Sequence, residues 1–228
     1  MALLFLIRHG QASAHEADYD QLSSLGYQQC EILKQFLHEE QIHPTKVFFG
    51  PRKRHRQTCE SIRQDHWPDG VLLPALDEYP AHELLEFGME QLVALEPHLR
   101  EQVELIQSST HSAGPDYVTL LQYSAQHWMN AKINHDDIET YKQYQIRLQT
   151  IQTLIQEAAP EDCIILVSSA GFISTLLTHL VGGKPEYSLN TAWSLYNASI
   201  STIYVKDFPS IASINQIYFL PKEYRTFI

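Results

Sequence analysis

The sequence predicts an α/β fold of three layers, in which helices flank a mostly parallel central sheet and a helical cap is inserted. Two observations predict it. Short, unbroken apolar runs at 3–7, 46–50 and 163–169 suit strands that are covered on both faces. Longer stretches between them, such as 23–41 and 138–158, read as helices. Strands that alternate with helices are typical of a parallel sheet.

The first strand is LLFLI (3–7), five apolar residues without a break. A helix follows over 23–41, where apolar residues recur at helical spacing and Ser23 or Ser24 can cap the N-terminus. Together they form the first strand–helix unit.

The second strand is KVFFG (46–50), which runs directly into the basic stretch PRKRHRQTCESIRQ (51–64). Pro51 suits a first helical turn and no apolar alternation follows, so this stretch is predicted to be helical. VLLPAL (71–76) is a third, less distinct strand signal.

The middle of the chain changes character from about residue 80. Over 80–137 the pattern is helical and polar, and we interpret it as an insertion packed over the sheet that lines a pocket. One long helix is predicted over 138–158. The length of 228 residues favours a single domain, 1–228, that carries this insertion.

The C-terminal part returns to the strand–helix pattern. CIILVSS (163–169) is a buried strand, and the helix over 170–183 is ended by paired glycines. Two further strands are predicted over 199–205 and 213–219, around a turn that contains Pro209.

The composition disfavours several classes of function. Acidic residues outnumber basic ones by 27 to 16, and a net charge of −11 disfavours non-specific binding to nucleic acid or anionic membranes. The three cysteines are widely spaced and the twelve histidines form no metal-binding motif, so no disulfide framework, metal or cofactor is expected. The apolar N-terminal run is too short for a signal peptide and no segment is long enough to span a membrane, which predicts a cytoplasmic protein.

Residues capable of chemistry follow three of the predicted strands. Arg8, His9 and Gly10 end the first strand, the basic stretch 51–64 follows the second, and Ser169 ends a later one. Ligands of open α/β sheets bind beyond the carboxyl ends of strands, where helix N-termini attract anions. The pattern favours a phosphate site, although solvent-exposed polar residues at a strand end and a solvated basic helix face remain alternatives.

These residues also carry a family resemblance. The Arg8-His9-Gly10 triplet resembles the signature of the histidine phosphatase superfamily, to which cofactor-dependent phosphoglycerate mutases belong. The segment GPRKRHRQTCESI is similar to the family's S-P-x-x-R-A-x-Q-T-A pattern, with Pro51, Arg54, Gln57 and Thr58 in register, Gly50 in place of Ser and His55 in place of Ala. The segment LDE (76–78) resembles the one that holds the family's proton donor, and IILVSSAGFI (164–173) stands where the family has V-S-H-G-G.

The departures from the family pattern indicate a phosphatase rather than a mutase. Ser169 stands where the family has its second histidine, which suggests a less characterised branch. His15 replaces an asparagine of the mutases, and the Trp-Glu-Gly pattern expected after the proton donor is missing.

The resemblance assigns two catalytic roles. His9 would be the nucleophile that forms a phosphohistidine, and its alternative is a core histidine held by the backbone. Glu78 would protonate the leaving oxygen and then activate water. Asp77, Glu83 and Glu86 are close enough in sequence to compete for that role.

Four further residues would bind the phosphate. Arg8 and Arg54 would clamp phosphoryl oxygens with their forked guanidinium groups, unless they form surface ion pairs. Ser169 would give a neutral hydrogen bond in place of the charged one from histidine. Gln11 would contact the phosphate or only shape the turn.

These assignments predict a phosphoric monoester hydrolase that acts on a small phosphorylated substrate, slowed by Ser169. The alternative is a phosphate-binding or regulatory pseudoenzyme that has lost catalysis with the second histidine. Retention of His9 and Glu78 together favours the enzyme. The sequence identifies neither the substrate nor the oligomeric state.

Overall fold

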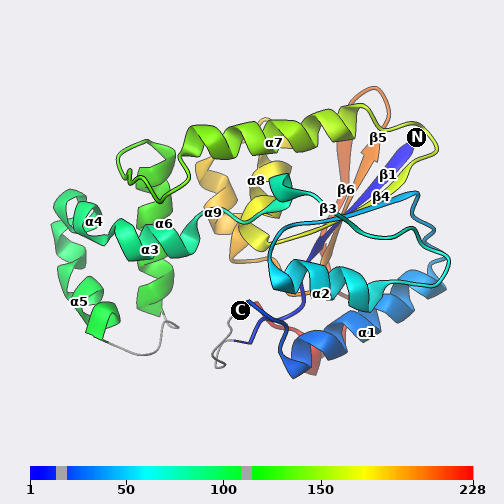
Figure 1. The fold of residues 1–228 in the computed structure, drawn as a ribbon, viewed down its shortest axis with the longest axis horizontal. Helices are drawn as coiled ribbons and strands as arrows, with labels where there is room; N and C mark the ends of the chain where they lie inside the picture. The colour runs from blue at the N-terminus through cyan, green and yellow to red at the C-terminus, as the bar shows by residue number, and fades with distance from the viewer. Residues whose placement is uncertain (14–19, 109–114, 228) are drawn as a thin grey trace. The chain divides into compact units, whose positions relative to one another are not determined.

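A computed structural model describes residues 1–13, 20–108 and 115–227 (Figure 1). His15, which replaces the mutase asparagine, lies outside these residues. The chain divides into two compact units. One, which we call the sheet unit, is formed by Met1–Glu78 and Leu148–Ile228, and the other, the helical unit, is formed by Tyr79–Arg147. The helical unit contains the stretch that the sequence marks as an insertion.

The sheet unit is built on one sheet, in which the described residues form six strands in the order β3-β2-β4-β1-β5-β6. The four strands from β3 to β1 run parallel, and β5 and β6 are antiparallel to their neighbours. The prediction of an α/β fold with a mostly parallel sheet is therefore confirmed. The strand bounds are Ala2–Arg8 for β1, Lys46–Phe49 for β2, Val71–Leu72 for β3, Cys163–Ser168 for β4, Ile200–Val205 for β5 and Pro209–Gln216 for β6.

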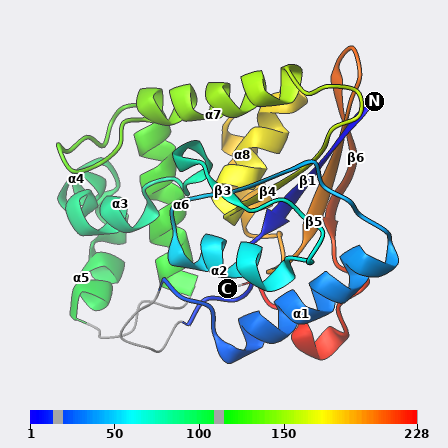
Figure 2. The same ribbon diagram turned by 45° about the vertical axis from the view of Figure 1, so that its right-hand side comes forward.

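Helices cover both faces of this sheet (Figures 1 and 2). The helices α1 and α2 contact each other on one face, and α8 covers the other. Their bounds are Ser24–Glu39 for α1, Lys53–Ile62 for α2 and Ala170–Leu180 for α8; α9 spans Glu186–Ala192, α7 spans Tyr141–Gln156 and so crosses the boundary between the units, and a short 3-10 helix covers Lys222–Tyr224.

The core explains why these strands are apolar at every position. Phe5 and Ile7 of β1 pack in the cluster that α1 and α2 cover, together with Leu33 of α1. Leu4 and Leu6 alternate with them, point to the other face and are equally buried. A central strand with both faces covered needs apolar residues throughout, as the run LLFLI predicts.

Three local predictions need correction. Pro51 does not lie in the first turn of α2, which begins at Lys53 with Arg52 as its N-cap. The stretch 71–76 is not one strand: only Val71–Leu72 pair with β2, and Pro74–Leu76 form a 3-10 helix, because a proline has no N–H to donate to a ladder. Pro209 does not lie in the turn but begins β6, opposite Val205. The edge of a sheet tolerates a proline where a central strand does not.

The helix start near residue 23 agrees with its capping signal. Ser23 is the N-cap of α1, and its Oγ accepts a hydrogen bond of 3.0 Å from the Gly26 N–H.

The helical unit has a small core of its own. Its helices pack around the buried side chains of Leu84, Leu92 and Trp128. The Trp128 indole donates a hydrogen bond of 2.6 Å to the Glu139 carbonyl. The bounds are Ala81–Phe87 for α3, Met89–Leu95 for α4, Pro97–Leu99 for a 3-10 helix, Arg100–Ser108 for α5 and Pro115–Met129 for α6. Among the described residues, no helix is long and apolar enough to cross a membrane.

Candidate active site

The site residues meet because β1 and β4 are neighbouring parallel strands. Their last residues, Arg8 and Ser168, lie opposite each other in the register. The His9 N–H continues the ladder with a hydrogen bond of 3.0 Å to the Ser168 carbonyl. His9 and Ser169 therefore leave the same edge of the sheet, where the carboxyl ends of parallel strands place ligands.

The turn after His9 requires a glycine. A Cβ on Gly10 would lie 2.7 Å from the Gly26 carbonyl oxygen of α1, closer than carbon and oxygen can approach. The Gly10 N–H also donates a hydrogen bond of 3.1 Å to Thr58 Oγ1 of α2. Both contacts hold the chain tightly against the two helices and so fix the direction of the neighbouring imidazole.

The imidazole of His9 is buried and neutral. Its Nδ1 lies 2.6 Å from the Gly10 carbonyl oxygen, which can only accept, so Nδ1 carries the proton. Nε2 is left with its lone pair, and it accepts a hydrogen bond of 3.1 Å from Nε of Arg54. Burial lowers the pKa of His9 well below its usual 6.5, and the positive charges of Arg54 and Arg8 lower it further.

Arg54 connects three groups of the site. Besides His9, its guanidinium donates to Asp20 Oδ1 at 2.8 Å and to Ser169 Oγ at 3.5 Å. The other carboxylate oxygen of Asp20 accepts a hydrogen bond of 2.9 Å from the Lys53 N–H at the start of α2. A carboxylate thus lies between a guanidinium and a helix N-terminus, the two groups that favour an oxyanion.

Arg8 is buried beside His9. Its guanidinium donates a short hydrogen bond to the Leu195 carbonyl. This contact with the backbone orients the side chain at the end of β1 and keeps its charge next to the imidazole. Arg8 and Arg54 are each 8 % exposed, so neither lies on the surface, and Arg54 forms its ion pair with Asp20 at 2.8 Å.

Ser169 is fully buried at the N-cap of α8, with its hydroxyl 2.6 Å from Nε2 of His55. His55 is also fully buried, and burial lowers its pKa well below 6.5, with smaller effects of Arg54 and Arg52 in the same direction. The site therefore contains a second neutral imidazole.

Glu78 contacts the start of helix α8, whose N-cap is Ser169. Its Oε2 accepts a hydrogen bond of 3.1 Å from the Gly171 N–H, in the first turn of that helix. Asp77, its competitor in sequence, instead accepts 2.7 Å and 2.8 Å hydrogen bonds from Arg52 Nε and the Glu78 N–H. Glu78 thus contacts the start of α8, whereas Asp77 is paired with Arg52.

The other two acidic competitors, Glu83 and Glu86, belong to the helical unit.

Gln11 takes part in the turn into α1. Its side-chain oxygen accepts a hydrogen bond of 2.9 Å from the Ser23 hydroxyl, and its N–H donates to Gln29 Oε1 at 2.8 Å. These contacts agree with the turn-shaping alternative for Gln11.

The sequence analysis assigns no role to two residues of the site, His55 and Asp20. His55 is recognisable in the sequence only as a departure from the family's alanine. Asp20 carries no signal, because its contact with Arg54 joins residues that are 34 positions apart in the chain.

The described residues contain no cluster of three or more metal-ligating side chains.

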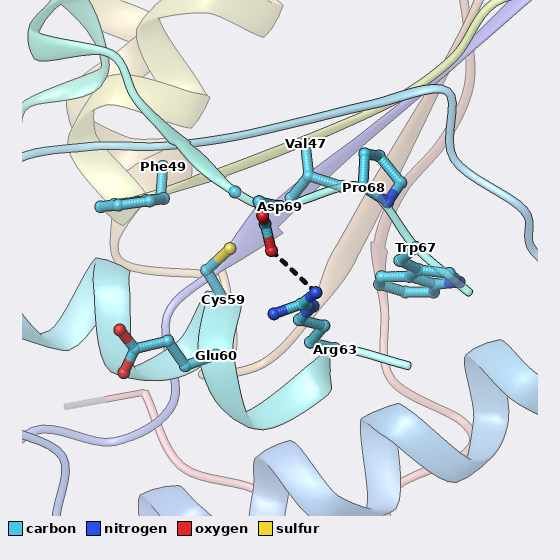
Figure 3. A pocket seen from close by; sticks show the side chains of 9 residues that line it. Val47, Phe49, Cys59, Glu60, Arg63, Trp67, Pro68 and Asp69 are labelled. Atoms are coloured by element: carbon cyan, nitrogen blue, oxygen red, sulfur yellow. Dashed lines mark ion pairs between the residues drawn. The ribbon is translucent and has the colours of Figure 1, made fainter. Parts of the chain in front are cut away.

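A hollow of about 260 Å³ lies between β2, α2 and residues 67–70 (Figure 3). Arg63 and Asp69, which line this hollow, form an ion pair of 2.7 Å. None of the predicted site residues lines the hollow. Burial raises the pKa of the Cys59 thiol in its wall to about 12, so this sulfur stays protonated.

Three solved structures that share this fold are distant in sequence. A phosphoserine phosphatase from Entamoeba histolytica, solved with phosphoserine, is 17 % identical with a TM-score of 0.64, over 97 % of this chain and 100 % of that one. The alpha-ribazole phosphatase from Shigella flexneri is 17 % identical with a TM-score of 0.60, over 94 % and 96 %. Bacillus stearothermophilus YhfR is 14 % identical with a TM-score of 0.66, over 97 % and 100 %.

A search of curated proteins finds no match. The family profile described as Histidine phosphatase superfamily (branch 1) matches residues 4–84 and 83–215, which is most of the chain. Together with the fold, this match shows that the chain belongs to the histidine phosphatase superfamily.

Proposed function

We propose that this protein is a phosphomonoester hydrolase that acts on a small phosphorylated substrate through a phosphohistidine on His9. The observation that carries the proposal is the hydrogen bonding of this imidazole. Its Nδ1–H donates to the Gly10 carbonyl, and its Nε2 lone pair accepts from the Arg54 guanidinium. A neutral imidazole beside an anion-binding cation is suited to attack phosphorus. Family membership and the phosphatases among its structural neighbours support the same class of reaction.

In the first step the substrate's phosphoryl group enters between His9 and Arg54. The Nε2 lone pair forms the N–P bond while the ester P–O bond breaks. The carboxyl group of Glu78 gives its proton to the leaving oxygen, so an alcohol departs. Arg8 and Arg54 neutralise the phosphoryl oxygens, on which charge is spread in the transition state.

In the second step water replaces the alcohol. The Glu78 carboxylate takes a proton from water as its oxygen attacks phosphorus. The N–P bond breaks, the electron pair returns to Nε2 of His9, and inorganic phosphate leaves. Glu78 is protonated again, and the imidazole is neutral as before.

Steady-state kinetics with p-nitrophenyl phosphate and an alkyl phosphomonoester test this proposal. His9→Asn should abolish turnover, because asparagine provides no atom at Nε2. Glu78→Gln should lower kcat by about 100- to 10,000-fold on the alkyl ester. The loss should be smaller on the aryl ester, whose leaving group needs less help from an acid. Asp77→Asn is the matched control and should change kcat far less.

Two outcomes contradict the proposal. Full turnover in His9→Asn would exclude this nucleophile. If the wild type binds phosphate but turns over no ester in a broad panel of phosphorylated metabolites, the protein is a phosphate-binding pseudoenzyme.

A further inference from the structure

The second imidazole of the site is bonded to the serine that stands in the place of the family's second histidine. Nε2 of His55 lies 2.6 Å from Ser169 Oγ, and both residues have no exposed surface. The ring centroids of His55 and His9 are 5.7 Å apart. Arg54 connects the His55–Ser169 pair to His9, since it donates to Ser169 Oγ and to Nε2 of His9, the atom that would attack phosphorus.

His55 fits only because residue 50 is a glycine. A Cβ on Gly50 would lie 2.4 Å from Nδ1 of His55 and 2.5 Å from the Leu76 carbonyl oxygen. No real Cβ approaches these atoms so closely. Three departures from the family pattern, at Gly50, His55 and Ser169, thus depend on one another in space although they lie far apart in the chain.

The hydrogen bonds of the Ser169 hydroxyl indicate where its proton points. The Nδ1 atom of His55 is buried and has no hydrogen-bond partner among the described residues. A hydrogen-bonding effect of the Gly50 backbone raises the His55 pKa, but its geometry lies outside that of a full hydrogen bond to Nδ1. A buried N–H without a well-placed acceptor is rare, so we assign the tautomer that carries the proton on Nε2. Nε2 then donates to Ser169 Oγ, as Arg54 does.

A hydroxyl oxygen accepts two hydrogen bonds and donates one. With both acceptor positions of Ser169 filled by His55 and Arg54, its proton remains to be donated. A phosphoryl oxygen bound between His9 and Arg54 would be its acceptor.

We propose that Ser169 donates a hydrogen bond to the transferring phosphoryl group and that His55 is the positioning residue that directs this hydroxyl, with Gly50 admitting the imidazole. Ser169 and His55 together thus replace the family's second histidine as the hydrogen-bond donor to the phosphoryl group. The inference rests on the proposed phosphatase function, which it deepens. Two positively charged groups, Arg54 and Arg52, act on the His55 imidazole and lower its pKa.

A double-mutant cycle tests the inference. Ser169→Ala and His55→Ala should each lower kcat by about 5- to 30-fold, the difference between a directed hydroxyl and none. The double variant should be no slower than Ser169→Ala, because His55 acts only through the hydroxyl. His55→Gln should recover activity, since its amide N–H reaches the position of Nε2, whereas the shorter His55→Asn should not.

Residue 50 provides an independent variant. Gly50→Ser should impair the wild type, in which its Cβ meets both His55 and the Leu76 carbonyl oxygen, more than it impairs His55→Ala, in which only the Leu76 contact remains. Thermal unfolding of each variant separates activity from loss of folded protein.

The affinity for inorganic phosphate, measured by calorimetry, separates this inference from the proposed function. Suppose that no ester is hydrolysed, but that Ser169→Ala and His55→Ala each weaken phosphate binding and the double variant weakens it no further than Ser169→Ala. The phosphatase proposal then fails, and the proposed role of His55 in directing Ser169 is supported. If esters are hydrolysed and His55→Ala, fully folded, changes neither kcat nor phosphate affinity, the pair is refuted alone. Additive effects of the two substitutions would also overturn it.

Discussion

Lowering the pH from 6.5 to 5.5 tests whether His9 and His55 are neutral in the folded protein. Both imidazoles are buried, and burial is the largest cause that lowers their pKa values well below 6.5. In the unfolded chain each would titrate near 6.5. The unfolded state therefore binds more protons over this interval, and the folded state loses stability as the pH falls.

The magnitude follows from this difference in proton uptake. An imidazole that titrates at about 6.5 when unfolded and stays neutral when folded costs about 1 kcal/mol between pH 6.5 and 5.5. His9 and His55 together should therefore remove about 2 kcal/mol from the free energy of unfolding. The stability that depends on the two neutral imidazoles is fully present above pH 6.5 and is lost progressively as the pH falls below it.

Urea unfolding at a series of pH values measures the effect. The wild type should lose about 1 kcal/mol more than either His9→Asn or His55→Gln over the same interval. Ser169→Ala is the matched control, since it alters the same buried network without removing an imidazole, and it should keep the wild-type dependence. If all four proteins lose stability in parallel, the two imidazoles are not buried in their neutral form and the assignment of a ready nucleophile fails.

Three further outcomes are expected. Arg54→Ala should lower kcat/KM by about 10- to 150-fold through the loss of a charge-assisted contact, and Arg54→Lys should recover only part of it; an unchanged kcat/KM would exclude the clamp. Asp20→Asn keeps a cap for α2 but removes the carboxylate that competes for Arg54, so KM should fall by about 2- to 5-fold, and a higher KM would contradict this competition. Gly10→Ala should destabilise the fold by about 1–3 kcal/mol in urea unfolding, and a change below about 0.5 kcal/mol would show that the turn can relax.

The sequence predicts the part of the site that depends on strand order and burial. Unbroken apolar runs identify β1 and β4, and a mostly parallel sheet brings the residues at their carboxyl ends together. Strand order alone therefore predicts that Arg8, His9 and Ser169 lie near one another. Arg54 joins them in this prediction because its helix follows directly from β2.

The rest depends on tertiary contacts that no local pattern encodes. The contact between His55 and Ser169 joins residues 114 positions apart, and its geometry depends on the absence of a side chain at Gly50. The carboxylate of Asp20 reaches Arg54 across 34 positions. No local sequence pattern marks His55 or Asp20 as part of the site, and only the folded chain brings them into one hydrogen-bonded network.

Trapping the reaction intermediate tests the central claim most directly. Wild-type protein quenched during turnover of a phosphomonoester, digested under alkaline conditions and analysed by mass spectrometry should carry a base-stable, acid-labile phosphate on His9. Phosphorus NMR of the labelled protein should place the phosphate on Nε2, because Nδ1 donates a hydrogen bond to the Gly10 carbonyl. Phosphate trapped on any other residue, or on no residue while turnover proceeds, would contradict the phosphohistidine account.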